Sequence, residues 1–247
     1  MTDVIQLQAL ATTLHALAGT STADAIGIVP AAAFGAERLG ILGEVVGTDG
    51  SLVVVAQRVI DPAQLVRFHD GATSRESRVS ASFADALLRD ASWRVVEILT
   101  DAGHRACIAR NLRYGSIRGT EHDHAISFVK AGELAGMGSR GRSQLLIHPQ
   151  WGPWLLLAAV LTDAELPCDK PRKDSPCGNC DACIRACPAG ALTGNGLNAE
   201  ACRDRVGPGG RALDQRLSAH GSIACDECRR ACPIGEAPPR FGEGETA

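Results

Sequence analysis

Apolar residues recur at three- and four-residue intervals at the start of the chain, and the pattern then changes to short continuous runs. The first stripe consists of Val4, Leu7, Leu10, Leu14 and Leu17. This spacing predicts one apolar face of a helix, which Gly19 ends. The runs AIGIVP at residues 25–30 and SLVVVA at residues 51–56 are short and rich in β-branched side chains, and they predict buried strands.

A second helical pattern covers residues 80–102 and stops at Gly103. Its apolar positions, which we expect to face a core, are Phe83, Leu87, Leu88, Val95, Val96, Ile98 and Leu99. After it, residues 106–109 predict a strand, and Cys107 within that strand is predicted to be a small apolar core residue. A helix-like run at residues 126–135 and an apolar strand at residues 145–147 follow.

Composition limits what this chain can do. Apolar residues make up 45% of it, which is enough for a core, but aromatic residues only 4%, so a broad stacking surface for single-stranded nucleic acid is not expected. The net charge of -3 points the same way. The longest apolar run, residues 154–161, is shorter than the about 20 residues that cross a bilayer. Because the N-terminus also lacks the features of a signal peptide, we expect a cytoplasmic protein without a membrane partner.

Cysteines give the strongest chemical signal. Eight of the ten fall within residues 177–233, in two runs that each end in Cys-Pro. They are Cys177, Cys180, Cys183, Cys187, Cys202, Cys225, Cys228 and Cys232. The spacing Cys-x2-Cys-x2-Cys-x3-Cys-Pro is the one by which bacterial ferredoxins hold a pair of [4Fe-4S] clusters. The ninth cysteine, Cys168, is predicted to lie in a linker at the domain boundary.

The same spacing predicts which cysteines share a cluster. In such runs the first three thiolates wrap one cluster and the fourth reaches the other. We therefore expect one cluster on Cys177, Cys180, Cys183 and Cys232, and a second on Cys187, Cys202, Cys225 and Cys228. Zinc is the main alternative, but its sites are commonly two separated Cys-x2-Cys pairs, with no need for a third cysteine in register. Disulfides are disfavoured because cytosolic thiols are kept reduced.

The middle of the chain is locally basic and contains a glycine loop. Residues 104–143 hold seven arginines and lysines against three acidic residues, an arrangement that would suit an anionic cofactor or substrate. Residues 136–141 formally match GxGxxG, yet a helix-like run precedes them and a strand follows, the reverse of the order in dinucleotide-binding folds. The glycines are better explained by a tight turn or by close approach of the backbone to a flat cofactor.

Several segments of the second half of the chain form a recognisable series: AGMGSRGRS at residues 135–143, LLIHP at residues 145–149, WGP at residues 151–153, AAVLTD at residues 158–163 and the cysteine block to Pro233. Together they resemble the epoxyqueuosine reductase family and, more distantly, reductive dehalogenases. The resemblance implies an α/β (α+β), nitroreductase-like domain over residues 1–165. A bacterial-ferredoxin-type domain with two [4Fe-4S] clusters would occupy residues 166–234, and residues 235–247 would be a flexible tail.

The resemblance also implies cofactors and partners. The clusters would pass electrons to a cobalamin, with flavin as the second choice, in the N-terminal domain. The residues expected to bind that cofactor are Gly136, Gly138, Arg140, Gly141, Arg142 and Ser143. An electron donor of the ferredoxin or flavodoxin type would be required, together with a small-molecule substrate or a partner corrinoid or flavin protein.

The sequence departs from the family in three places, one of which is the glycine loop, where GSRGRS at residues 138–143 replaces the family's Gly-Trp-Ile-Gly-Lys-Asn. The family's Asp-Thr-x-Pro-x-x-Glu-Arg motif, whose aspartate donates a proton, is missing, and residues 121–127 read EHDHAIS instead. Asp123, His122 and His124 are therefore the candidate proton donors. The helical extension that some members use to grip tRNA is also missing after the cysteines, and on that ground tRNA is a doubtful partner.

Three classes of function stay open at this point. The first is an oxidoreductase that reduces a small substrate at a cobalamin or flavin. The second is an electron carrier or reductive activator for a partner corrinoid or flavin protein, and the third is a protein that binds or handles cobalamin. The sizeable apolar N-terminal region favours the first or third, whereas the missing acid motif favours the second or third. We favour the first by a small margin.

Overall fold

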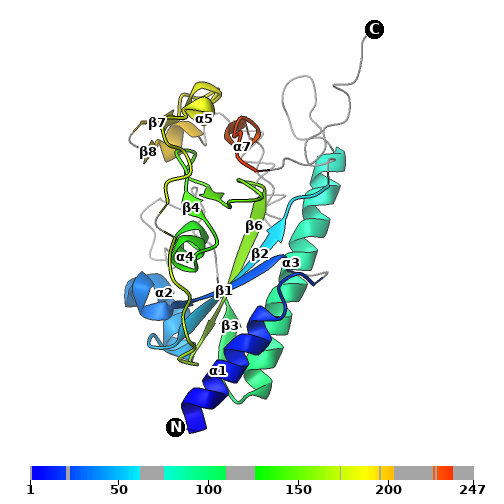
Figure 1. Ribbon diagram of the computed structural model, residues 1–247, viewed down its shortest axis with the longest axis vertical. Coiled ribbons are helices and arrows are strands. Elements are labelled where there is room, and N and C mark those ends of the chain that lie inside the picture. The colour runs from blue at the N-terminus through cyan, green and yellow to red at the C-terminus, as the bar shows by residue number, and fades with distance from the viewer. Residues whose placement is uncertain are drawn as a thin grey trace. The chain divides into compact units, whose positions relative to one another are not determined.

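The structure is a computed structural model that describes residues 2–20, 23–61, 75–109, 126–172, 174–194, 196–202, 225 and 227–235, and all structural statements below concern these residues (Figure 1). The helices are α1 (Thr2–His15), η1 (Ala31–Phe34, a 3-10 helix), α2 (Ala36–Val46), α3 (Arg75–Asp101), α4 (Phe128–Leu134), α5 (Ala182–Arg185) and α7 (Glu227–Arg230). The strands are β1 (Ala25–Pro30), β2 (Ser51–Arg58), β3 (Ala106–Ile108), β4 (Ser139–Arg140), β5 (Leu146–Ile147), β6 (Leu155–Thr162), β7 (Leu192–Thr193) and β8 (Gly196–Leu197).

A four-stranded sheet in the order β1-β2-β6-β3 forms the centre of the fold (Figure 1). β1 pairs antiparallel with β2, in a register that places Ile28 opposite Val53, and β3 pairs antiparallel with β6, with Cys107 opposite Leu161. Seven of the eight residues of β2 are buried, so this strand is apolar on both faces rather than alternating. The continuous apolar runs in the sequence therefore indicate a sheet that is covered on both faces.

Helices α1 and α4 contact β1, and α2 contacts β3. In α1 the buried residues are Ala11 and Leu14, while Val4 is 69% exposed. From Leu88 onward, the buried residues of α3 are Leu88, Ala91, Ser92, Val95 and Leu99. These residues recur at helical spacing and form one buried face of the helix.

Most elements predicted from the pattern are confirmed, with small shifts at their ends. The expected strands at residues 25–30, 51–56 and 106–109 are β1, β2 and β3, and the expected helices are α1, α3 and α4. The prediction that Phe83 and Leu87 face the core was wrong, because these side chains are 70% and 41% exposed. Phe83 and Leu87 share the four-residue spacing of the buried Ala91, Val95 and Leu99, so spacing alone does not separate the exposed positions of α3 from the buried ones.

Asp169 holds the segment after β6 against the edge of the sheet. Its carboxylate Oδ2 accepts a hydrogen bond from the Ile28 N–H at 2.7 Å, and its own N–H donates to the Ile28 carbonyl at 2.8 Å. His15 Nε2 lies 3.5 Å from the same carboxylate oxygen. Nearby, Gly136 has a φ of 69°, and an added Cβ there would collide with the Lys170 carbonyl oxygen.

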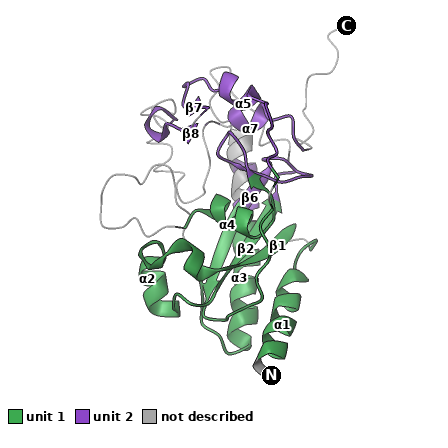
Figure 2. Cartoon of the chain, turned by 60° about the vertical axis from the view of Figure 1, so that its left-hand side comes forward, with its two compact units in different colours: residues 1–57, 87–139, 157–174 green, residues 58–86, 140–156, 175–247 purple. Residues whose placement is uncertain are grey.

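The chain divides into two compact units, each built from several stretches of sequence (Figure 2). Unit 1 takes residues 1–57, 87–139 and 157–174, and unit 2 takes residues 58–86, 140–156 and 175–247. The cysteine-bearing unit therefore includes residues 140–156, which contain no cysteine. The domain boundaries expected after residues 165 and 234 stay a prediction. In the ranges that the structure describes, no helix is both long and apolar enough to cross a bilayer.

Replacing Leu161 in β6 should destabilise unit 1 strongly. Its side chain is fully buried, so Leu161→Ala should lower the free energy of unfolding by about 2–5 kcal/mol through lost burial and a residual cavity. Ile41→Ala is the matched control, since Ile41 is 65% exposed and its loss should change stability by about 0.5 kcal/mol or less. Anaerobic urea unfolding followed by circular dichroism measures both, and equal effects would contradict the assigned core.

Candidate functional site: a cysteine-lined cavity

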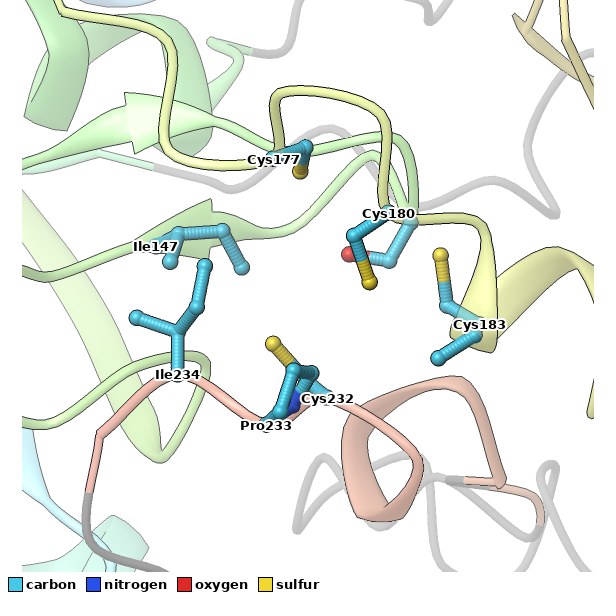
Figure 3. A pocket seen from close by; sticks show the side chains of 9 residues that line it. Ile147, Cys177, Cys180, Cys183, Cys232, Pro233 and Ile234 are labelled. Atoms are coloured by element: carbon cyan, nitrogen blue, oxygen red, sulfur yellow. The ribbon is translucent and has the colours of Figure 1, made fainter.

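Four cysteines from two distant parts of the chain line one cavity in unit 2. The cavity is lined by Ser143, Ile147, Cys177, Cys180, Ala182, Cys183, Cys232, Pro233 and Ile234. Figure 3 shows the side chains of Cys177, Cys180, Cys183 and Cys232 arranged around this space. This is the set that the ferredoxin spacing predicts for one cluster, and here the structure brings all four together.

Local structure explains how three of these thiols reach the cavity. The Cys180 N–H donates to the Cys177 carbonyl at 2.8 Å, which closes a tight turn between them. Helix α5 follows at once, and it places Cys183, which is only 8% exposed, at its second position. Cys232 comes from the turn that follows α7, and α5 and α7 contact each other.

The walls of the cavity are apolar and the thiols influence one another's ionisation. Burial raises the pKa of the Cys183 thiol, and the nearby Cys177, Cys232 and Cys180 raise it further. Burial also raises the pKa of Cys232, with Cys177 and Cys180 adding to the effect. Thiolates crowded together in this way need a cationic partner, and a cationic iron core would supply one. The donor set therefore fits a [4Fe-4S] cluster.

The four cysteines line a cavity rather than converging on a single point. Across the described ranges, no three His, Cys, Asp or Glu side chains are grouped as they would be around a single metal ion. All ten cysteines are free thiols.

The second predicted set is described only in part. Burial raises the pKa of Cys228 to about 11; Arg229 opposes this rise, and the charges of Cys225, Cys202 and Cys183 add to it. Cys187 follows α5 in a turn whose backbone N–H groups bond its sulfur. Burial raises the pKa of Cys187, but hydrogen bonds from Leu192, Ala189, Ala191 and Gly190 outweigh it, and its pKa falls. Residues 203–224, between Cys202 and Cys225, lie outside the described residues.

The predicted glycine loop is divided between the two units. Gly136 and Gly138 belong to unit 1, whereas Arg140, Gly141, Arg142 and Ser143 belong to unit 2. Gly141 has the close contacts expected of such a glycine, since an added Cβ would lie 2.7 Å from Ile147 Cγ1 and 3.4 Å from Cys177 Sγ. Helix α4 precedes the loop and β5 follows it, as predicted, so the dinucleotide-binding order is absent from this segment.

Arg142 and Ser143 lie at the cysteines. The Arg142 backbone N–H donates to Cys177 Sγ at 3.3 Å, and its Nη1 donates to the Cys180 carbonyl at 3.4 Å. Ser143 is 7% exposed and lines the cavity. Sequence reasoning assigned both residues to a corrinoid or flavin; their position beside a Cys-x2-Cys turn is a long-range contact that no local pattern reveals.

Other predicted residues are placed as follows. Asp123, His122 and His124 lie outside the described residues. Cys107 is half-buried in β3, where burial raises its pKa, and the prediction of a core position is met only in part. Cys168 is exposed, beside the Asp169 contact to β1.

A glycine pair near Cys232 escaped sequence reasoning. Gly152 has a φ of 56° and Gly235 a φ of 80°. A Cβ added to Gly152 would collide with the Ile234 carbonyl oxygen, and one added to Gly235 would collide with the backbone of Trp151 and Gly152. The two backbones therefore touch where only glycine fits, two to three residues from Cys232.

Tryptophans surround this contact. Trp151 stacks on His148, with ring centroids 3.9 Å apart, and the Arg58 guanidinium lies 5.4 Å from the centroid of a Trp151 ring. Trp154 is 2% exposed, with the Arg229 guanidinium 5.7 Å from its ring. Its indole Nε1 finds no hydrogen-bond partner in the portion of the chain that is described. The glycine-proline step of the WGP run, at residues 152–153, is the signal in the sequence that could have indicated this close backbone contact.

These features define an iron-sulfur protein, and comparison with known proteins agrees. Residues 176–235 match the family model for a 4Fe-4S double cluster binding domain. The epoxyqueuosine reductase of Listeria monocytogenes is 41% identical over 78 residues, which are 31% of this chain and 20% of that protein. The epoxyqueuosine reductase of Synechococcus sp. (strain RCC307) is 49% identical over 61 residues, which are 25% of this chain and 19% of that protein. The matching region thus spans about a fifth of the length of these relatives.

Solved structures share the fold more widely. A structure of epoxyqueuosine reductase with a tRNA-Tyr epoxyqueuosine-modified tRNA stem loop matches with a TM-score of 0.60 at 21% identity, covering 91% of this chain and 65% of that chain. A reductive dehalogenase, described with a mechanism for B12-dependent dehalogenation, matches with a TM-score of 0.62 at 20% identity, covering 96% of this chain and 33% of that chain. The predicted resemblance to both groups is confirmed, and the fold is mixed α/β with an iron-sulfur domain.

The expectation that tRNA is a doubtful partner was wrong. It rested on the missing helical extension that some family members use to grip tRNA, yet an epoxyqueuosine reductase of this fold is seen with a tRNA stem loop.

Gly152→Ala should remove one cluster without touching a ligand. The added Cβ would displace Ile234 and with it Cys232, so iron content after anaerobic reconstitution should fall from about eight to about four per chain. Gly194→Ala is the control, since its added Cβ would meet no atom within 4 Å. Iron and sulfide analysis measures both variants, and full iron content in Gly152→Ala would contradict this role of the glycine pair.

Proposed function

We propose that this chain is an iron-sulfur oxidoreductase that passes electrons through two [4Fe-4S] clusters to a cobalamin, with flavin as second choice, in a nitroreductase-like region of residues 1–165. The observation that carries the proposal is the cavity lined by Cys177, Cys180, Cys183 and Cys232. Thiolates in an apolar cavity beside a second cysteine set suit electron transfer, since such clusters change charge without moving ligands.

The ligand sets are part of this proposal. Cys177, Cys180, Cys183 and Cys232 would hold the first cluster, and Cys187, Cys202, Cys225 and Cys228 the second. The backbone hydrogen bonds to Cys187 would stabilise its thiolate for that purpose. α5 carries Cys183 and leads into Cys187, so one short helix would join the two ligand sets.

The cobalamin assignment is supported by the likeness in fold to a B12-dependent dehalogenase. Unit 1 also contains buried polar atoms that a ligand with amide groups would satisfy: Ser139 Oγ and Gln57 Oε1 are buried without a hydrogen-bond partner among the residues described. Ser139 lies inside the glycine loop, which keeps Gly136, Gly138, Arg140, Gly141, Arg142 and Ser143 as candidates for cofactor binding. When bound, cobalamin would supply a low-valent cobalt able to reduce a substrate.

The chain's own residues would bind the cofactor and deliver a proton. Asp123, His122 and His124 are our candidates for the proton donor. A small molecule is the substrate we first consider, and the tRNA stem loop seen with a related fold makes a tRNA-borne nucleoside a second class to test. A donor of the ferredoxin or flavodoxin type would supply the electrons.

Single cysteine substitutions should separate the clusters. Cys187→Ser should damage the second cluster and spare the first, whereas Cys177→Ser should do the reverse, because each removes a ligand from one proposed set only. Cys107→Ser is the control, since Cys107 lies in β3 outside both sets. Electron paramagnetic resonance of the dithionite-reduced proteins resolves the two signals, and equal damage to both by either variant would count against the pairing.

Anaerobic reconstitution with and without cobalamin or flavin tests the function itself. We expect about eight irons per chain and a shift of the bound cobalamin spectrum on reduction. Four or fewer irons after full reconstitution would refute the two-cluster proposal. If neither cofactor binds, the oxidoreductase proposal fails and electron transfer to a partner corrinoid or flavin protein takes its place. Reduction of an epoxide-bearing nucleoside, offered free and within a tRNA stem loop, compares the two substrate classes.

A further inference from the structure

Arg142 belongs to the glycine loop proposed to bind the cofactor, but its contacts are with the first cysteine set. Two of its donors bond the Cys177–Cys180 turn: the backbone N–H reaches the Cys177 sulfur at 3.3 Å, and Nη1 reaches the Cys180 carbonyl at 3.4 Å. The guanidinium thus lies beside the turn that carries two of the four proposed ligands. The side chain is half-buried.

The turn around Arg142 is tightly determined. The Gly141 N–H donates to the Leu145 carbonyl at 2.9 Å, and the Gln144 N–H donates to the Gly141 carbonyl at 2.9 Å. Gln144 has a φ of 63°, the left-handed region that non-glycine residues seldom adopt. Because Gly141 has no Cβ, the backbone approaches Ile147 and the Cys177 sulfur closely enough for the next N–H to point at that sulfur.

The apolar surroundings strengthen the effect of the Arg142 charge on a cluster held by the first cysteine set. Ile147, Pro233 and Ile234 line the same cavity, so water screens an interaction there less than at the surface. A cluster gains one negative charge when it takes up one electron. Hydrogen bonds to ligand sulfur and nearby positive charge both favour the reduced form, and they are among the factors that set cluster potentials.

We propose that Arg142 is a positioning residue of the first cluster: it fixes the Cys177–Cys180 turn and raises the reduction potential of the cluster held there. This inference rests on the proposed first cluster. The arginine does not touch a substrate, and its role is to keep a hydrogen-bonded cation beside the ligand turn. Removing it should make the first cluster harder to reduce while leaving the second unchanged.

The test is a redox titration of the reconstituted full-length chain, followed by electron paramagnetic resonance. The step that disappears in Cys177→Ser identifies the first cluster. In Arg142→Met, the ratio of reduced to oxidised first cluster at the wild-type midpoint should fall about threefold to tenfold, and tenfold corresponds to about 59 mV for a one-electron couple. Arg142→Lys, which keeps the charge, should recover part of the shift.

Arg185→Met is the matched control. Arg185 also lies in the cysteine region, two residues after Cys183, but it is exposed and paired with Asp181, so its removal should shift the potential little. If the reduction potential of the first cluster in Arg142→Met equals that in Arg185→Met within experimental scatter, at equal iron content, the inference is overturned. Should Arg142→Met not hold the first cluster, Arg142→Gln, which also removes the charge, decides by the same criterion. A wild-type chain that assembles no first cluster would refute the proposed function, a result distinct from an unchanged potential.

Discussion

Everything proposed for this chain depends on the meeting of two distant segments at one cavity. Cys177, Cys180 and Cys183 come from a single tight turn and the short helix α5, but Cys232 must be delivered from beyond α7. Closing such a loop costs conformational entropy, which local propensity cannot offset. The packing of Gly152 against Ile234 and Gly235 supplies a fixed position for that segment, because each of the two glycines leaves space that the other backbone fills.

The sequence predicted the sheet well, and it predicted that Cys177, Cys180, Cys183 and Cys232 come together. Both predictions rest on local patterns: the strands on continuous β-branched runs, and the cysteines on the spacing Cys-x2-Cys-x2-Cys. It failed where a choice between helical faces depends on neighbours. Phe83 and Leu87 fit an apolar helix, yet the buried stripe is carried by Leu88, Ala91, Val95 and Leu99. An alanine at a buried helical position gives too weak a signal to be recognised without the sheet it covers.

The glycine loop shows a second kind of limit. Its residues were recognised as unusual, and their backbone conformations explain why: Gly136 has a left-handed φ and Gly141 has no room for a Cβ. What the sequence could not reveal is that Arg142 and Ser143 lie at the cysteine cavity. Contacts between a loop and residues 35 positions later follow from the tertiary fold, and a motif match cannot supply them.

The contact between Asp169 and β1 has a consequence beyond local stability. β1 lies at one end of the four-stranded sheet, where unpaired N–H and C=O groups would otherwise present a template for another chain. Asp169 occupies both the N–H and the carbonyl of Ile28, in the middle of that strand. The same stretch leads from the sheet toward the first cysteine turn. The connector that carries Asp169 therefore occupies the middle of this sheet edge, so that Ile28 has no free backbone group there for another strand to pair with.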